Sequence, residues 1–233
     1  MDTLEYAPGR AVDVHPGGTR GHVLVWHGRG PNQRPALVTL GALVAEHGLT
    51  VVVPDWSSEE RDGGRSELLA SLRFTRDLME RDGADPDALT LVGWSLGGAA
   101  AVGVTFATDR LGVGVAHVVG LGNGGYRGDE PISGGPIPAE VPRDVDRPPF
   151  TLLHGVADDI APVAGARAFA QQLEQQDWPV ELVELPTDHW GIVGTTYDAA
   201  TDVCSPADDD ATRRVVQDVA DRIAAAALSR ASR

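Results

Sequence analysis

The chain has 233 residues, of which 42% are hydrophobic, and its formal net charge at pH 7 is −15. A charge of this sign argues against attraction to nucleic acid or to an anionic membrane, so we expect neither as a partner. Cys204 is the only cysteine, which excludes a disulfide framework or a cysteine metal cluster within one chain. Residues 1–6 have neither a basic start nor an apolar stretch, and no apolar run approaches the ~20 residues of a membrane span. We therefore expect a cytoplasmic location.

Short apolar segments alternate along the chain with segments of helical length. We expect strands at residues 11–14, 23–26, 50–53, 89–92, 115–121, 150–153 and 180–185. We expect helices at residues 35–46, 66–81, 96–108, 163–176 and 211–228. This alternation predicts an α/β fold in a single domain over residues 1–233, with a mostly parallel sheet and helices on both faces. Functional side chains would then gather at the carboxyl ends of the strands.

The fourth expected strand is followed at once by a Gly-x-Ser-x-Gly motif, made of Gly93, Trp94, Ser95, Leu96 and Gly97. A helix of small residues is expected directly after the motif, so Ser95 falls on a tight strand-to-helix turn. Such a turn presents a nucleophilic serine, and glycines let strand and helix approach closely around it. The alternative is an ordinary glycine-rich turn, because the chain contains 28 glycines. The strand before the motif and the helix after it favour the nucleophile.

A nucleophilic serine needs a base that takes its proton. Downstream of Ser95, the loop after the sixth expected strand carries Asp158 and Asp159, and the loop after the seventh carries His189. Other histidines that could serve as the base are His15, His22, His27, His47, His117 and His154. Several of these lie in or at the ends of expected strands and helices, where histidines are more typical of packing. His189 is therefore the preferred base.

The order Ser, Asp, His on loops after successive strands resembles that of the α/β-hydrolase superfamily. The resemblance covers residues 23–228 and includes the segment His27-Gly28-Arg29-Gly30 after an early strand. It implies a catalytic triad of Ser95, Asp158 and His189. It also implies that the backbone N–H groups of Arg29 and Leu96 form an oxyanion hole, although Arg29 stands where many lipases and esterases have glycine.

The acid has two alternatives. The resemblance aligns Asp158, four residues before Pro162, with the family's carboxylate, whereas Asp159 is the neighbour that would cap a helix beginning near Pro162. Asp55 ends a strand that faces the same side of the sheet, so it would either shape the pocket or replace Asp158 as the acid.

Residues 122–149 contain six glycines and six prolines, which argues against any helix there. Many α/β-hydrolases insert a helical lid at this point, so we expect a loop and an open site instead. Trp56, Trp94 and Trp190 each border a loop on the catalytic side. We expect at least one of them to line the substrate pocket, with core packing as the alternative.

The resemblance and the triad together predict a serine hydrolase that cleaves small to medium carboxylic esters through an acyl-enzyme, without a cofactor or metal. The acidic run at residues 208–210 precedes a helix and is interpreted as a cap. An amidase or formamidase, a thioesterase and an acyltransferase are alternatives on the same triad. A hydrolase-like ligand-binding protein of low turnover is an alternative of another class. The sequence does not indicate the oligomeric state.

Overall fold

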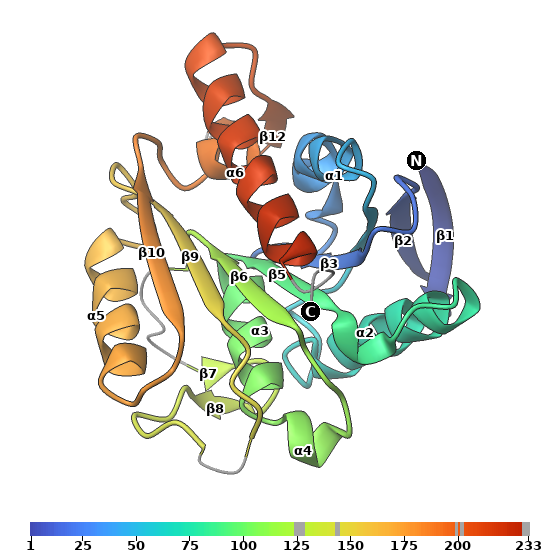
Figure 1. The fold of residues 1–233 in the computed structure, drawn as a ribbon. Helices are drawn as coiled ribbons and strands as arrows, with labels where there is room; N and C mark the ends of the chain where they lie inside the picture. Colours follow the sequence, from blue (N-terminus) through green and yellow to red (C-terminus); the bar gives the residue numbers. More distant parts are fainter. Residues whose placement is uncertain (124–128, 143–144, 199, 201–202, 230–233) are drawn as a thin grey trace.

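The computed structural model describes residues 1–123, 129–142, 145–198, 200 and 203–229. A sheet of eight strands forms its centre (Figure 1). In spatial order the strands are β1 (Asp2–Ala7), β2 (Arg10–His15), β4 (Thr50–Pro54), β3 (His22–Trp26), β5 (Thr90–Trp94), β6 (His117–Leu121), β9 (Phe150–Gly155) and β10 (Val180–Leu185). The strands from β4 to β10 run parallel, while β2 is antiparallel to both β4 and β1. The expectation of a mostly parallel sheet is confirmed.

Helices cover both faces of this sheet (Figure 1). They are α1 (Val38–Ala45), α2 (Arg65–Arg81), α3 (Leu96–Thr105), α4 (Thr108–Leu111), α5 (Val163–Glu174) and α6 (Asp210–Leu228), with 3-10 turns η1 (Arg34–Leu37), η2 (Pro86–Ala88) and η3 (Gly191–Val193). One core lies between the sheet and α1 with α6, and the other lies under α2, α3 and α5. Successive residues of β3 alternate between the two cores, as the period of two in a strand requires: Val23 and Val25 face one, Leu24 and Trp26 the other.

Each of the seven expected strands and five expected helices has a counterpart in the structure, with shifted ends. The expected helix at residues 96–108 is shorter, because α3 ends at Thr105 and α4 is a separate turn. Three antiparallel pairings were not expected from the sequence. They are β1 with β2, β7 (Asp129–Glu130) with β8 (Gly135–Pro136), and β11 (Thr195–Asp198) with β12 (Val203–Pro206).

The segment that replaces a lid contains no helix over its described residues, 129–142 and 145–149, which we call the flap. It carries the small ribbon β7–β8 and packs against the carboxyl-terminal half of α3. Gly103 allows this packing, because a Cβ there would overlap the carboxylate of Glu130. Residues 124–128 and 143–144 of the expected loop lie outside the described residues. Among the helices that are described, none combines the length and the apolar character needed to cross a bilayer.

Candidate active site

Ser95 occupies the turn between β5 and α3. Its backbone angles, φ 54° and ψ −120°, are rare for residues other than glycine. Its N–H donates a hydrogen bond of 2.9 Å to the carbonyl of Leu121, at the end of the adjacent strand β6. Backbone strain of this kind persists only where the surrounding structure enforces it, and it is concentrated at functional sites.

The glycines of the motif are required by close approach of the backbone. A Cβ at Gly93 would overlap the carbonyl of Gly97, and a Cβ at Gly97 would overlap the carbonyls of Trp26 and His27. Helix α3 therefore starts in direct contact with β5 and with the loop after β3. The turn with Ser95 therefore lies at the carboxyl end of β5, between the strand and the helix.

Asp158 and His189 form a buried pair at the same edge. Oδ2 of Asp158 lies 2.8 Å from Nδ1 of His189, and the two residues are 6% and 3% exposed. Oδ1 of Asp158 accepts hydrogen bonds from the N–H groups of Ile160 at 3.1 Å and Ala161 at 2.7 Å. Both carboxylate oxygens are thus held, and Nδ1 of the imidazole is turned toward the acid. Nε2 is the remaining ring nitrogen that can accept a proton.

Neither alternative to Asp158 forms the pair with His189. Asp159 is exposed. The N-cap of α5 is Pro162, and no side chain caps this helix, so the expected cap by Asp159 does not form. Asp55 is buried, and its Oδ2 lies 3.1 Å from Nε of Arg34, which also pairs with Asp13. The geometry therefore brings only Asp158, of the three, to His189.

Gly122, directly after β6, connects the serine with the acid–base pair. A Cβ at Gly122 would lie 3.3 Å from Oδ2 of Asp158 and 3.4 Å from Nδ1 of His189, while the preceding Leu121 binds the N–H of Ser95. Within the described part of the chain the hydroxyl of Ser95 makes no hydrogen bond to His189. Catalytic hydrogen bonds are often loose without substrate and tighten only in the complex, so this geometry is compatible with proton transfer.

The segment after β3 passes beside Ser95, as the resemblance implies. A Cβ at Gly28 would lie 3.2 Å from the Cβ of Ser95. Nε2 of His27 accepts a hydrogen bond from the N–H of Trp56 at 3.1 Å, so the ring proton is on Nδ1, which donates to the carbonyl of Gly28 at 2.9 Å. Burial lowers the pKa of His27 to about 4, which keeps the ring neutral.

The fixed carbonyl of Gly28 also sets the direction of the next N–H. In a trans peptide the C=O and N–H groups point in opposite directions, so the N–H of Arg29 is turned away from His27. The N–H of Gly30 is occupied by Oγ of Ser58 at 3.0 Å. The N–H of Leu96 lies in the first turn of α3, where backbone donors have no partner within the helix. Both N–H groups belong to segments that meet at Ser95, and their role as an oxyanion hole stays a prediction.

Two of the three tryptophans pack in the core, as the alternative expectation had it. Trp56 is 0% exposed and stacks on His27, with ring centroids 5.4 Å apart. Trp94 is 2% exposed, and its Nε1 donates to the carbonyl of His189 at 3.0 Å. Both side chains are therefore packing residues behind the site. Trp190 is half-buried, with its ring edge-on to Trp94 and stacked on Tyr197.

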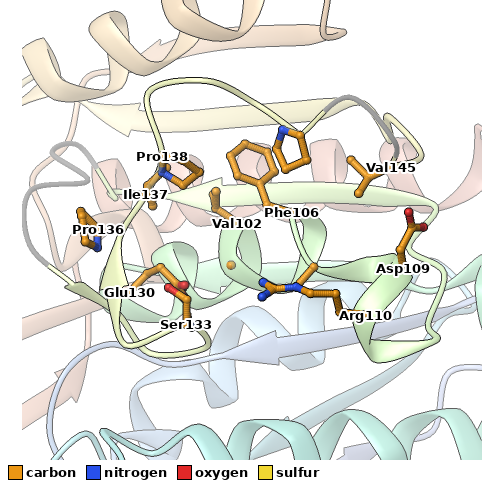
Figure 2. Close-up of a pocket in the computed structure, with 13 residues that line it drawn as sticks. Val102, Phe106, Asp109, Arg110, Glu130, Ser133, Pro136, Ile137, Pro138 and Val145 are labelled. Atoms are coloured by element: carbon orange, nitrogen blue, oxygen red, sulfur yellow. Dashed lines mark hydrogen bonds between the residues drawn. The ribbon is translucent and has the colours of Figure 1, made fainter.

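A hollow of about 550 Å³ lies between the flap and the far end of α3 (Figure 2). Val102 and Phe106 of the helix face Ile137 and Pro138 across it. Val102 and Phe106, which directly follows the last residue of α3, lie about 10 and about 16 Å along the helix axis from Ser95, and none of the triad candidates lines the hollow. The hollow is thus separate from the site described above.

The described residues contain no group of three or more His, Cys, Asp or Glu side chains that could hold a metal ion. Asp209 caps α6 by accepting a hydrogen bond from the N–H of Thr212 at 2.8 Å, in line with the interpretation of residues 208–210 as a cap. The sequence analysis did not predict a role for Asn123. Its buried side chain lies against Gly98 and Gly120, where a Cβ would meet it.

The order of the sheet, the strained serine turn and the loops that carry Asp158 and His189 define the α/β-hydrolase fold. No protein-family model matches the chain, and no curated protein matches it. Among solved structures, Thermogutta terrifontis esterase 2 phosphorylated by paraoxon aligns with a TM-score of 0.71 at 16% identity, covering 96% of this chain and 93% of that chain.

The butyrate-bound form of the same T. terrifontis esterase aligns with a TM-score of 0.69 at 15% identity, over 95% of this chain and 92% of that one. MGS-M1, an α/β-hydrolase enzyme from a Medee basin deep-sea metagenome library, aligns with a TM-score of 0.67 at 17% identity, over 98% and 97%. At these identities the comparisons show a shared fold.

Proposed function

We propose that the chain is a serine hydrolase that cleaves small to medium carboxylic esters through an acyl-enzyme. The observation that carries the proposal is the buried Asp158–His189 pair, placed beside the strained turn of Ser95 at one edge of the sheet. In the proposed reaction Oγ of Ser95 attacks the ester carbonyl while Nε2 of His189 takes the hydroxyl proton. Asp158 holds the imidazole in the correct tautomer and stabilises its charged form.

The remaining steps follow from the same groups. The tetrahedral oxyanion accepts hydrogen bonds from the N–H groups of Leu96 and Arg29, each worth about 3 kcal/mol in comparable sites. The proton on His189 passes to the leaving alcohol as the carbon–oxygen bond breaks. Water then attacks the acyl carbonyl while Nε2 of His189 takes one of its protons. The bond between the acyl carbon and Oγ of Ser95 breaks, the proton passes from His189 to Oγ, and the carboxylic acid is released.

Short acyl groups are the proposed substrates. Solved structures of the T. terrifontis esterase have butyrate or propionate bound, which supports esters of this size for a chain of the same fold. The strained Ser95 also favours an enzyme over a ligand-binding protein, because a binding site has no need for a serine held at this cost.

The proposal is tested with p-nitrophenyl esters from acetate to octanoate and with fluorophosphonate labelling. Ser95→Ala is expected to lower kcat by around 10⁶-fold and to abolish labelling, with an unchanged Tm. Ser66→Ala, at an exposed serine of α2, is the matched control and should keep both turnover and labelling. Labelling at a different serine, or no turnover and no labelling by the wild-type protein, would refute the proposal.

A further inference from the structure

A second imidazole lies against the proposed catalytic acid. His154, the residue before the last of β9, is fully buried, and its Nε2 is 3.5 Å from Oδ2 of Asp158. The same oxygen lies 2.8 Å from Nδ1 of His189. Oδ2 of Asp158 therefore sits between two histidines, of which the proposed mechanism uses one.

The protonation of His154 follows from its contacts. Nε2 lies 2.7 Å from the carbonyl oxygen of Ala161, which can only accept, so Nε2 carries the ring proton. Nδ1 is buried and has no hydrogen-bond partner in the described part of the chain. A second proton would have to go to Nδ1 without an acceptor, and burial lowers the pKa of His154, so the ring is neutral.

Ala161 connects His154 with the acid a second time. Its N–H donates to Oδ1 of Asp158 at 2.7 Å, and its carbonyl accepts from Nε2 of His154. Ala161 therefore links the carboxylate of Asp158 to the imidazole of His154 through its own N–H and carbonyl groups. The other charged group opposite His154 is Glu184 of β10, which pairs with Arg167 of α5 at 2.6 Å.

We propose that His154 is a positioning residue for the catalytic acid, an inference that rests on the proposed function. Its Nε2–H holds the carbonyl of Ala161, and the N–H of Ala161 in turn holds Oδ1 of Asp158, so that Oδ2 is directed at His189. Because the second imidazole is neutral, the negative charge of Asp158 has no competing cation and stabilises the imidazolium of His189 alone.

The proposal predicts a specific pattern of effects. Without a donor at residue 154, the carbonyl of Ala161 loses the hydrogen bond that ties it to the buried imidazole, and the loop of Asp158 rearranges. Stabilisation of the imidazolium then falls, which lowers kcat. KM should be unchanged, because the side chain of His154 is fully buried and cannot touch the substrate.

Three variants test this pattern. His154→Gln keeps an N–H donor at the same number of bonds from the backbone as Nε2, and it cannot become charged. His154→Leu removes the donor at similar volume. His117→Leu is the matched control, since His117 lies on β6 at the opposite end of the sheet, with Nε2 2.9 Å from Oγ1 of Thr151. If the leucine variant at residue 154 does not fold, His154→Asn takes its place, because its amide is one bond too short to reach Ala161.

Two readouts are needed. The first is kcat and KM for p-nitrophenyl butyrate per fluorophosphonate-titrated site. We expect His154→Leu to lose about tenfold to a hundredfold in kcat, less than the about 10⁴-fold typical of replacing the acid itself, with KM within about twofold. His154→Gln should recover most of this loss, and His117→Leu should match the wild type.

The second readout is the proton NMR signal of Nδ1–H of His189 in its hydrogen bond to Asp158, assigned by its loss in His189→Gln. The signal should disappear or move upfield in His154→Leu and persist in His154→Gln. A signal and a kcat in His154→Leu equal to those of His117→Leu would overturn the proposal, as would a glutamine variant as impaired as the leucine variant. Absence of turnover in the wild type refutes the proposed function instead, while the NMR comparison still decides the role of His154.

Discussion

Asp158 uses both carboxylate oxygens, one toward His189 and the other toward the backbone of its own loop. Its neighbour Asp159 is exposed, so the two residues form a matched pair for mutation. Asp158→Asn is expected to lower kcat by up to about 10⁴-fold, because the amide no longer selects the tautomer of His189 or stabilises its charged form. Asp159→Asn should leave kcat within about twofold. Parallel measurements of kcat and Tm check both variants. A larger loss of kcat in Asp159→Asn than in Asp158→Asn would show that Asp159 is the acid.

His27 makes folding stability depend on pH. The unfolded chain binds a proton at this histidine below its ordinary pKa of 6.5, whereas burial lowers the pKa of the folded chain to about 4. Between these values the unfolded state binds more protons, so stability is present above about pH 6.5 and falls as the pH drops toward about 4. The shift corresponds to about 3 kcal/mol.

His27→Asn tests this directly, since asparagine keeps a donor at the position of Nδ1 and does not titrate. We expect the free energy of unfolding to fall less steeply from pH 6.5 to pH 4 in the variant than in the wild type. Denaturant unfolding at a series of pH values gives the comparison. An identical slope for both proteins would show that His27 is protonated in the folded state.

At the scale of elements, the serine turn depends on contact between α3 and the loop after β3. Gly97→Ala would place a methyl group against the carbonyls of Trp26 and His27, which are backbone atoms that cannot rotate away. We expect a loss of about 1–3 kcal/mol in the free energy of unfolding and a lower kcat, because the first turn of α3 must move.

Gly135→Ala is the control for this change, as the nearest atom to its Cβ would be Oγ of Ser133 at 3.8 Å. Its stability and kcat should match those of the wild type. Denaturant unfolding and ester turnover measure both variants, and a Gly97 variant with unchanged kcat would show that the elbow tolerates displacement of the helix.

The expected preference for short substrates rests on the lack of a helical lid over the described residues of the flap. These residues contain no helix and lie on the far half of α3. We therefore expect kcat/KM to be highest for acetate to butyrate esters and to fall toward octanoate, with no activation on emulsified triglyceride. Rates measured on both sides of the solubility limit check this, and a jump above the limit would contradict it.

For the whole molecule, the sequence predicts the parts whose signal is local and apolar. The buried strands β3, β4 and β5 and the amphipathic helices α2 and α6 follow from hydrophobic periodicity. The exposed strand β1 has no such alternation, because one edge of a sheet needs only backbone pairing. The order of Ser95, Asp158 and His189 also follows from the sequence, since each lies after a predicted strand.

Other features depend on distances that a sequence does not contain. Trp56 and Trp94 border the correct loops, yet whether an indole faces solvent or core depends on neighbours from distant segments, here His27 and His189. The contact of His154 with Asp158 has the same origin. In a helix a spacing of four residues predicts contact, but in an irregular loop the contact between His154 and Asp158 depends on the course of the turn between them.

The two outermost strands, β1 and β10, have a consequence for how copies of this protein meet in a crowded solution. An unpaired strand edge is a template onto which another chain can add. Here β1 carries Asp2 and Glu5, and β10 carries Glu181, at opposite sides of the sheet (Figure 1). Two copies that approach edge to edge would bring carboxylates of the same charge close together. Like-charge repulsion at both margins therefore works against runaway stacking of sheets into aggregates, and a molecule with a net charge of −15 reinforces it.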